Sequence, residues 1–446
     1  MKILYAASEA VPFCKTGGLA DVAGSLPPAL AEQGAETAVI LPLYRRIREK
    51  FADQLTFLCY DYVDLAWRHT YCGLFSMKKD DVTWYFLDNE QYFDRPELYG
   101  YVDDGERFGF FSRAVVKMLD HLEFWPDVIH CNDWQTALIP IYLKDDGVRE
   151  DRYRSIRTVL TIHNIEYQGR YDPYCLGDLF GLDRGWVDDG TLLLDGDLNL
   201  LKGAILTADA VNAVSPTYAQ ELKNPYFAHR MEGILTQCGY KLSGVLNGID
   251  MKLYDPAADG RITANYTAED LSGKAADKTA LQNLMGLNEE PNTPIIAMVS
   301  RLVSHKGLDL LREVMGDIME LPAQFVVLGS GDAGYEEFFR RTAERYPGRM
   351  AVRLGYNEAL SMAIYAGADL FLMPSRSEPC GLSQMISMRY GTVPIVRETG
   401  GLKDTVQPYE AWRDAGTGFT FANYSSADML HVIREAVYLY LSLIHI

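Results

Sequence analysis

Residues 370–406 read LFLMPSRSEPCGLSQMISMRYGTVPIVRETGGLKDTV, and this stretch decides the fold class. Its apolar run 370–374 has the length of a strand, 381–390 has a helix-compatible composition, and 392–396 is strand-like again. This order predicts a βαβ unit of a parallel sheet. Because ligands of such sheets bind outside the carboxyl ends of the strands, the loops of this stretch are predicted to form one rim of a site.

The loops of this stretch carry polar and small residues: Ser375, Arg376, Glu378, Cys380, Thr399, Gly400 and Gly401. A second interpretation treats Glu378 as a solvated carboxylate, Cys380 as a small buried residue and the glycines as turn residues. The rest of the chain decides between the two interpretations.

Length and composition exclude several classes of protein. The 446 residues predict roughly two to three domains with large cores. The chain has no run of about 18 uncharged apolar residues, and the apolar run near residue 3 is too short for a signal peptide, so we expect no membrane partner. Seven cysteines without a C-x-x-C pair indicate reduced thiols in a cytoplasm. The net charge of −19 argues against a nucleic-acid partner.

The N-terminal part repeats the βαβ pattern, with a strand at 2–7, a helix at 19–33 and a strand at 37–41. The loop before the helix reads K-T-G-G, which places Lys15 and bare backbone N–H groups at a helix N-terminus and favours an anion site. A plain tight turn with a solvated Lys15 is the alternative, with Asp21 as a first-turn carboxylate favoured by the helix dipole.

Residues 56–87 form short alternating runs that predict strands, and 89–106 are predicted to form a long surface loop. This loop is rich in aromatic residues: Tyr92, Phe93, Tyr99 and Tyr101. Such rings suit stacking on sugars, or they pin the loop to its own domain. A helix is predicted to follow at 108–122.

Two further strands, 127–131 and 158–162, end in polar residues. Asp133 and Trp134 follow the first, and His163 and Asn164 follow the second. A single histidine at a strand end is more often structural. Polar residues at the ends of several parallel strands, however, are typical of an active site, and we favour a functional role for Asp133 and His163.

The triplet Asp195-Gly196-Asp197 resembles a paired-carboxylate metal site. Because it directly precedes a predicted helix at 198–207, Asp195 or Asp197 is more consistent with a helix cap. We therefore predict no catalytic metal.

Composition changes near residues 240–250, and the second half again shows a strand at 295–300, a basic loop with Arg301 and Lys306, and a helix. Further strands are predicted at 324–328, 351–354, 370–373, 392–396 and 419–421. The fold class is therefore α/β, with two doubly wound domains at 1–245 and 246–446 facing across a cleft. Lys15 and His163 are expected to face Glu378 across it.

Five motifs occur in a specific joint order: K-T-G-G-L, N-G-I-D, R-L-x-x-x-K-G, E-P-C-G-L and E-T-G-G-L. In this order they resemble bacterial glycogen synthase, and plastid starch synthases are similar. The resemblance covers nearly the whole chain. It implies two Rossmann-like domains in the glycosyltransferase B arrangement, which form a retaining enzyme. The enzyme would move glucose from ADP-glucose, a substrate, to the non-reducing end of an α-1,4-glucan such as glycogen. The resemblance implies no metal or other cofactor.

The resemblance also implies roles for single residues. Glu378, His163, Asp133, Lys306 and Arg301 would be catalytic, with Arg301 and Lys306 on the diphosphate. The donor phosphates and sugar would be bound by Lys15, Gly17, Gly18, Asp21, Trp134, Asn164, Asn247, Cys380, Gly381, Leu382, Thr399, Gly400 and Gly401. Tyr356 resembles the residue that stacks on the adenine.

The C-terminal residues 441–446, LSLIHI, differ from the family, whose members continue for several tens of residues. We expect a truncated or aberrant terminus with reduced stability or a loosened hinge. Two rival functions remain open. One is a related transferase that uses UDP-glucose or a small acceptor, and the other is a non-catalytic protein that binds glucan or nucleotide sugar.

Overall fold

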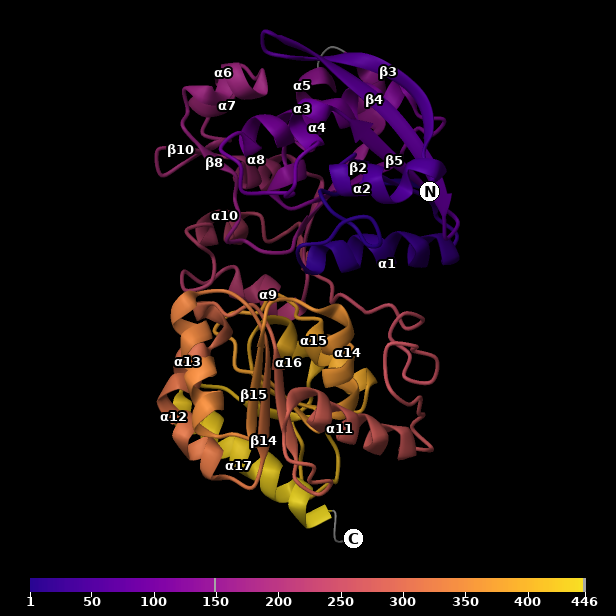
Figure 1. Ribbon diagram of the computed structural model, residues 1–446. Coiled ribbons are helices and arrows are strands. Elements are labelled where there is room, and N and C mark those ends of the chain that lie inside the picture. The colour runs from indigo at the N-terminus through magenta and orange to yellow at the C-terminus, as the bar shows by residue number, and fades with distance from the viewer. Residues whose placement is uncertain (148–149, 444–446) are drawn as a thin grey trace. The chain divides into compact units, whose positions relative to one another are not determined.

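The computed structural model describes residues 1–147 and 150–443, which form two compact units, Met1–Val245 and Leu246–Ile446. Residues 444–446 of the predicted aberrant terminus lie outside the described residues. Each unit contains a mainly parallel sheet with helices packed on it (Figure 1). The predicted α/β class of two doubly wound domains is confirmed.

The first unit is built on a nine-stranded sheet in the order β12-β11-β7-β6-β1-β2-β5-β4-β3. The strands are β1 Lys2–Ala6, β2 Glu36–Pro42, β3 Thr56–Leu65, β4 Arg68–Lys79, β5 Val82–Asp88, β6 Val128–Asn132, β7 Arg157–Ile162, β11 Ala210–Ala213 and β12 Leu242–Gly244. A small sheet joins β8 Arg170–Tyr171, β9 Leu193–Leu194 and β10 Asp197–Asn199. The helices are α1 Gly18–Glu32, α2 Arg45–Phe51, α3 Glu90–Phe93, α4 Asp104–Met118, α5 Leu138–Gly147, α6 Cys175–Phe180, α7 Gly185–Asp188, α8 Leu200–Thr207, α9 Pro216–Glu221 and α10 Glu232–Gln237.

The second unit has a six-stranded parallel sheet in the order β15-β14-β13-β16-β17-β18. The strands are β13 Ile295–Val299, β14 Gln324–Gly329, β15 Met350–Leu354, β16 Leu370–Met373, β17 Val393–Arg397 and β18 Phe419–Phe421. The helices are α11 Ser272–Met285, α12 Leu308–Glu320, α13 Ala333–Arg345, α14 Glu358–Gly367, α15 Ser383–Arg389, α16 Gly400–Thr405 and α17 Ser426–Leu443. The predicted strands of this unit all occur, with bounds that shift by one or two residues.

Helices cover both faces of the second sheet, which explains why its strands are apolar throughout. Ile296 and Met298 of β13 belong to one core cluster, with α12, α13 and α17, whereas Ile295 and Ala297 belong to the other, with α11 and α14 (Figure 1). A parallel sheet buried on both faces requires such continuous apolar strands.

Both sheets reverse their strand order next to their first strand. In the first unit β1 lies between β2 and β6, and in the second β13 lies between β14 and β16. The order in which the chain adds strands to each sheet therefore reverses between β1 and β6 and between β13 and β16, and doubly wound sheets bind ligands at such positions. The loops after β1 and β6 form one candidate half-site in the first unit, and the loops after β13 and β16 form another in the second.

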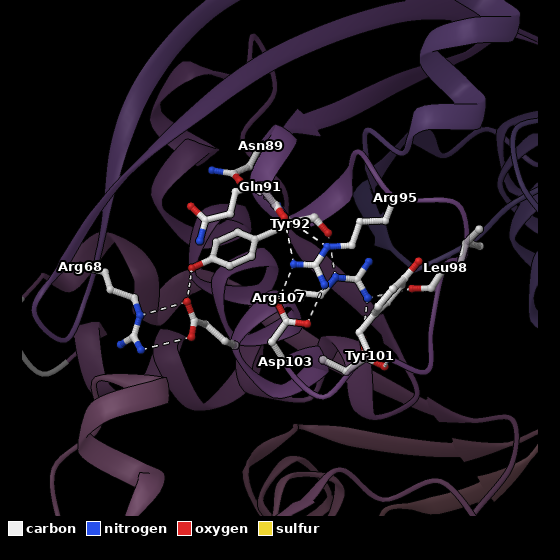
Figure 2. Close-up of polar contacts among 11 residues, drawn as sticks. Arg68, Asn89, Gln91, Tyr92, Arg95, Leu98, Tyr101, Asp103 and Arg107 are labelled. Carbon is white, nitrogen blue, oxygen red and sulfur yellow. Dashed lines mark hydrogen bonds and ion pairs between the residues drawn. The ribbon is translucent and has the colours of Figure 1, made fainter.

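The aromatic segment after β5 is packed into the first unit, so the predicted long surface loop is wrong. It contains α3, and the rings of Tyr92 and Phe93 are buried. The Tyr92 hydroxyl donates to Glu106, and the fully buried Arg107 donates to the carbonyl oxygens of Tyr92 and Leu98 (Figure 2). The rings therefore pin the segment to its own unit, one of the two interpretations left open.

Helix α4 begins at Asp104, four residues before the predicted start. Its first turn contains Asp104 and Glu106, and such an acidic turn is hard to tell from a loop in the sequence. The expectation that Asp195 or Asp197 caps the next helix is also wrong. Asn199 caps α8 by accepting a hydrogen bond from the Lys202 N–H, and the two aspartates pair with Arg230 and Arg170 instead. Ser215 caps α9 by accepting a hydrogen bond from the Tyr218 N–H.

Candidate active site

Asp133 lies directly after β6 and turns its carboxylate toward the end of the neighbouring β7. Its backbone has a φ of 55°, in the left-handed region that non-glycine residues rarely adopt. The carboxylate accepts hydrogen bonds from the N–H groups of His163, at 2.7 Å, and Asn164, at 3.4 Å. The structure thus joins three residues that the sequence placed at two separate strand ends.

His163 is held in one orientation by a buried amide. Its Nε2 lies 2.8 Å from Oδ1 of Asn132, whose amide nitrogen donates to the Ala6 carbonyl. An amide oxygen only accepts, so Nε2 carries the proton and Nδ1 is left as an acceptor. Burial, with a smaller effect of His130, lowers the pKa of His163 to about 3. The ring is therefore neutral at physiological pH.

The pKa of Asp133 is raised to about 7, chiefly by burial and slightly by the negative charge of Glu9, against the two backbone hydrogen bonds that lower it. A buried carboxyl with a pKa near neutrality exchanges a proton readily. Such perturbed groups gather at functional sites.

The K-T-G-G loop is fixed by two acids. Nζ of Lys15 lies 2.7 Å from Oδ1 of Asp21 in an exposed ion pair, so the alternative of a tight turn with a solvated Lys15 stays open. Glu9 accepts hydrogen bonds from the backbone N–H of Thr16, at 2.5 Å, and from its hydroxyl, at 2.7 Å. Gly17 and Gly18 follow at the start of the 15-residue helix α1, whose N-cap has no side-chain hydrogen bond. The N–H groups in the first turn of a helix suit an anion.

Sequence reasoning missed Glu9, although it follows β1 as Asp133 follows β6. Burial raises its pKa to about 7, while the hydrogen bonds from Thr16 lower it. Glu9 lies in the loop after β1, where the strand order of the sheet reverses. This position becomes recognisable as a candidate site position only when the pairing of β1 with β6 is known.

In the second unit, the turn Ser304–Lys306 follows β13 and packs on the end of β16. Gly307 has a φ of +76°, and a Cβ there would lie 2.1 Å from the Pro374 carbonyl oxygen, so only glycine fits. This close approach brings Nζ of Lys306 to 2.6 Å from Oε2 of Glu378. Ser375 donates to the same oxygen at 3.0 Å.

Glu378 is buried but charged. Burial raises the pKa of its carboxyl, yet the charge and hydrogen bond of Lys306, aided by Ser375, outweigh burial, so that the pKa is lowered overall. The interpretation of Glu378 as a solvated loop carboxylate is wrong, because the residue is 7% exposed. The pair places a cation and an anion together at the carboxyl ends of the strands.

The E-P-C-G-L and T-G-G-L loops pack directly on one another. A Cβ at Gly400 would lie 2.0 Å from the Glu378 carbonyl oxygen, and one at Gly401 would lie 2.2 Å from that of Cys380. The glycines are therefore required by close approach. Burial raises the pKa of the Cys380 thiol to about 12, against hydrogen bonds with Asn247 that lower it, so Cys380 is not a nucleophile at neutral pH.

The other predicted site residues lie around these groups. Arg301 and Tyr356 are exposed at strand ends, with 70% of Tyr356 accessible. Thr399 is buried at the N-cap of α16, Leu382 lies at the N-cap of α15, and Gly381 precedes it with a φ of +73°. The ring of Trp134 packs against Phe108 and Tyr171 inside the first unit.

A second residue missed from the sequence is Arg397 at the end of β17. Its guanidinium donates to the carbonyl oxygens of Ser375, at 2.9 Å, and Arg376, at 2.6 Å, and so holds the loop that carries Glu378. Buried arginines that satisfy several carbonyls fix loop geometry.

Within each unit the structure brings Asp133 to His163 and Lys306 to Glu378, while the binding roles of these residues and the meeting of the two half-sites across a cleft stay predictions. Among residues 1–147 and 150–443, no group of three or more His, Cys, Asp or Glu side chains is arranged to hold a metal ion. In the same ranges no helix is long and apolar enough to cross a membrane.

Comparison with known proteins defines the class. Residues 2–237 match the family model of the starch synthase catalytic domain, and residues 284–438 match that of glycosyl transferases group 1. A solved structure of the catalytic domain of starch synthase IV from Arabidopsis thaliana, bound to ADP and acarbose, superposes with a TM-score of 0.89 and 34% identity over 98% of this chain and 92% of that one. A sucrose-phosphate synthase from Thermosynechococcus elongatus, at 17% identity and a TM-score of 0.60, shares the fold. The chain is a two-domain glycosyltransferase of the B type.

Curated relatives narrow the class further. Glycogen synthase of Bacillus cereus is 48% identical over 440 residues, which cover 99% of this chain and 92% of that protein. Glycogen synthase of Ligilactobacillus salivarius is 48% identical over 441 residues, with 99% and 93% covered. The chain belongs to the glycogen synthase family, whose activity is glucosyl transfer in glycogen synthesis.

Proposed function

We propose that the protein transfers glucose from ADP-glucose to the non-reducing end of an α-1,4-glucan with retention of configuration. The observation that carries this proposal is the ion pair of half-buried Lys306 with buried Glu378, at the point where the strand order of the second sheet reverses. A nucleotide-sugar donor needs cations where its diphosphate leaves and an acceptor of hydrogen bonds where its sugar lies, and this pair supplies both.

The leaving diphosphate gains negative charge while the sugar becomes oxocarbenium-like, and preorganised charges stabilise both. We propose that Lys306 and Arg301 bind the diphosphate, and that Glu378 orients the sugar hydroxyls and stabilises the cationic ring. A charge-assisted hydrogen bond contributes about 1.5 to 3 kcal/mol, so two cations would supply about 3 to 6 kcal/mol of transition-state stabilisation. Substrate positioning would supply much of the rest.

We propose that Glu378 acts as a charge partner and not as a covalent nucleophile; Lys306 and Ser375 both donate hydrogen bonds to its Oε2, which supports this role. We propose attack by the acceptor hydroxyl on the same face, assisted by the leaving phosphate. Trapping a glucosyl-enzyme at Glu378 would overturn this part of the proposal.

The first unit would supply the groups around the acceptor and the donor phosphates. The neutral His163 offers an unprotonated Nδ1, and Asp133 carries a proton that titrates near neutrality. The α1 N-terminus with Lys15 would bind phosphate. We propose that no metal or other cofactor takes part, because Lys15, Arg301 and Lys306 provide the positive charge.

We also propose that the protein works in the cytoplasm. All seven cysteines are free thiols, although five of them are buried. Such a set is typical of a reducing compartment.

The test is transfer of labelled glucose to glycogen from ADP-glucose and from UDP-glucose in competition, with and without a chelator. We expect ADP-glucose to be preferred and the chelator to have no effect. Preference for UDP-glucose would replace the donor, loss of activity with chelator would contradict the absence of a metal, and no incorporation from either donor would leave a binding protein.

A further inference from the structure

A buried amide side chain joins three strands at the half-site of the first unit. Asn132 is the last residue of β6, directly before Asp133, and it is fully buried. Its oxygen Oδ1 lies 2.8 Å from Nε2 of His163, which follows β7, and 2.9 Å from the hydroxyl of Tyr5 on β1. Two side chains from neighbouring strands therefore meet at one amide oxygen.

The backbone of β1 and β6 sets the orientation of this amide. Its nitrogen Nδ2 donates to the carbonyl oxygen of Ala6, at 3.0 Å, and to that of His130, at 3.3 Å. Because a carbonyl oxygen only accepts hydrogen bonds, the flipped amide would place Oδ1 against two acceptors. Oδ1 is therefore fixed on the side of Tyr5 and His163.

Both side chains on this oxygen are donors. Burial and the charge of Asp133 raise the pKa of Tyr5, so its hydroxyl stays protonated and donates to Oδ1. Burial, with a smaller effect of His130, lowers the pKa of His163, so the ring is neutral and carries one proton. That proton is on Nε2, where the bond to Oδ1 requires a donor, and Nδ1 is left able only to accept.

Two consecutive residues at the end of β6 thus hold different parts of the same histidine. Asp133 accepts a hydrogen bond from the backbone N–H of His163, and Asn132 accepts one from its ring. His163 is half-buried, so part of the residue stays accessible. A polar group whose position and proton are both fixed in advance needs little rearrangement when it meets a substrate.

We propose that Asn132 is a positioning residue, which acts through His163 by holding the ring as the Nε2–H tautomer and keeping Nδ1 as a hydrogen-bond acceptor. The group that Nδ1 accepts from would be a hydroxyl of the sugar substrate, and this inference rests on the proposed function for that identity. The tautomer is a property of the protein without substrate, so it is measured separately from transfer.

The test combines glucose transfer with direct observation of the ring. Protein labelled with ¹⁵N in its histidines reports each tautomer in long-range ¹H–¹⁵N correlation spectra, and His163→Gln identifies the signals of this residue. Asn132→Leu removes the acceptor at similar volume, and Asn132→Ala removes it with less bulk. Asn89→Leu is the matched control, because Asn89 is also a buried asparagine of the first unit but caps α3 by accepting from the Tyr92 N–H.

We expect the wild type to show His163 as the Nε2–H tautomer at neutral pH. Both Asn132 variants should lose this single tautomer and should lower kcat/KM for transfer to glycogen about tenfold or more, because the ring is no longer held in place. Asn89→Leu should keep the tautomer and kcat/KM of the wild type. Circular dichroism reports whether each variant is folded.

A double-mutant cycle separates positioning from a general structural effect. If Asn132 acts through His163, Asn132→Ala should lower kcat/KM little further once His163→Gln is present, whereas independent losses multiply. Multiplying losses would overturn the inference, and so would a wild type with the proton on Nδ1 or a folded Asn132 variant that keeps the single tautomer.

The two readouts distinguish this inference from the proposed function. Wild-type transfer in Asn132 variants that have lost the tautomer would overturn the positioning role and leave the proposed function intact. The expected tautomer in a protein that transfers glucose from neither ADP-glucose nor UDP-glucose would overturn the proposed function and, with it, the catalytic role of Asn132.

Discussion

The ionisable groups of the two half-sites differ in charge state. In the first unit the buried groups are shifted toward their neutral forms, with pKa values of about 7 for Glu9, about 7 for Asp133 and about 3 for His163. In the second unit a lysine keeps Glu378 charged. Burial disfavours charge unless a counterion lies nearby, and Glu378 has one in Lys306, whereas Glu9 and Asp133 accept hydrogen bonds from neutral groups. The difference indicates that the second unit holds the permanent charge and the first holds exchangeable protons.

The largest loss of activity is expected for substitution of the charged Glu378 in the second unit. Glu378→Ala should lower kcat/KM by at least about a hundredfold, because it removes both the acceptor of the sugar hydroxyls and the partner that positions Lys306. Initial rates of glucose transfer to glycogen measure it. Glu320→Ala, an exposed carboxylate at the end of α12, serves as the matched control and should retain full activity. A fully active Glu378→Ala would remove this residue from the mechanism.

The next largest effect is expected for substitution of Lys306, the ion-pair partner of Glu378. Lys306→Ala should lower kcat/KM at least about tenfold and the free energy of unfolding by about 3 kcal/mol, because Glu378 is left buried without a counterion. Steady-state kinetics and urea unfolding measure the two effects. Adding Glu378→Gln to this variant should restore part of the stability and none of the activity. Wild-type kinetics in Lys306→Ala would exclude Lys306 from catalysis.

A smaller effect is expected at Glu9 and depends on pH. The native pKa is raised from 4.5 to about 7, so the native state binds more protons than the unfolded state between these values. The free energy of unfolding therefore falls as pH rises through this window, by at most about 3 kcal/mol from this group. Glu9→Gln should lose that part of the slope, as measured by urea unfolding from pH 4.5 to pH 8. Equal slopes in the two proteins would contradict the neutral-form assignment.

The smallest effect is expected for Asp133→Asn. At pH 8 burial opposes the charged form, and asparagine still accepts from the His163 and Asn164 N–H groups, so the free energy of unfolding should change by less than about 1 kcal/mol. Asp133→Ala, which leaves both donors unpaired, should cost about 1 to 3 kcal/mol. A large loss for Asp133→Asn would show that the first unit, like the second, depends on a buried charge.

Much of the fold followed from local patterns. Apolar runs of strand length that alternate with helical segments predicted both doubly wound domains. Errors arose where local signals competed. Asp195 and Asp197 are good helix caps, yet Asn199 takes this role because the short strand β10 extends to it and the aspartates pair with arginines from distant segments.

Taken by itself, the sequence determined the class of the protein and the loops that carry its chemistry, because strand periodicity and ordered motifs are properties of neighbouring residues. Tertiary structure decided which of those loops touch. Lys306 and Glu378 are 72 positions apart and meet only because β13 and β16 are adjacent. It also decided the charge states of Glu9, Asp133 and His163, since burial depends on residues far along the chain. The exposure of Tyr60 and Tyr62 follows from the same cause, because β3 is the edge strand of the first sheet and, among the residues that the structure describes, no helix covers its outer face there.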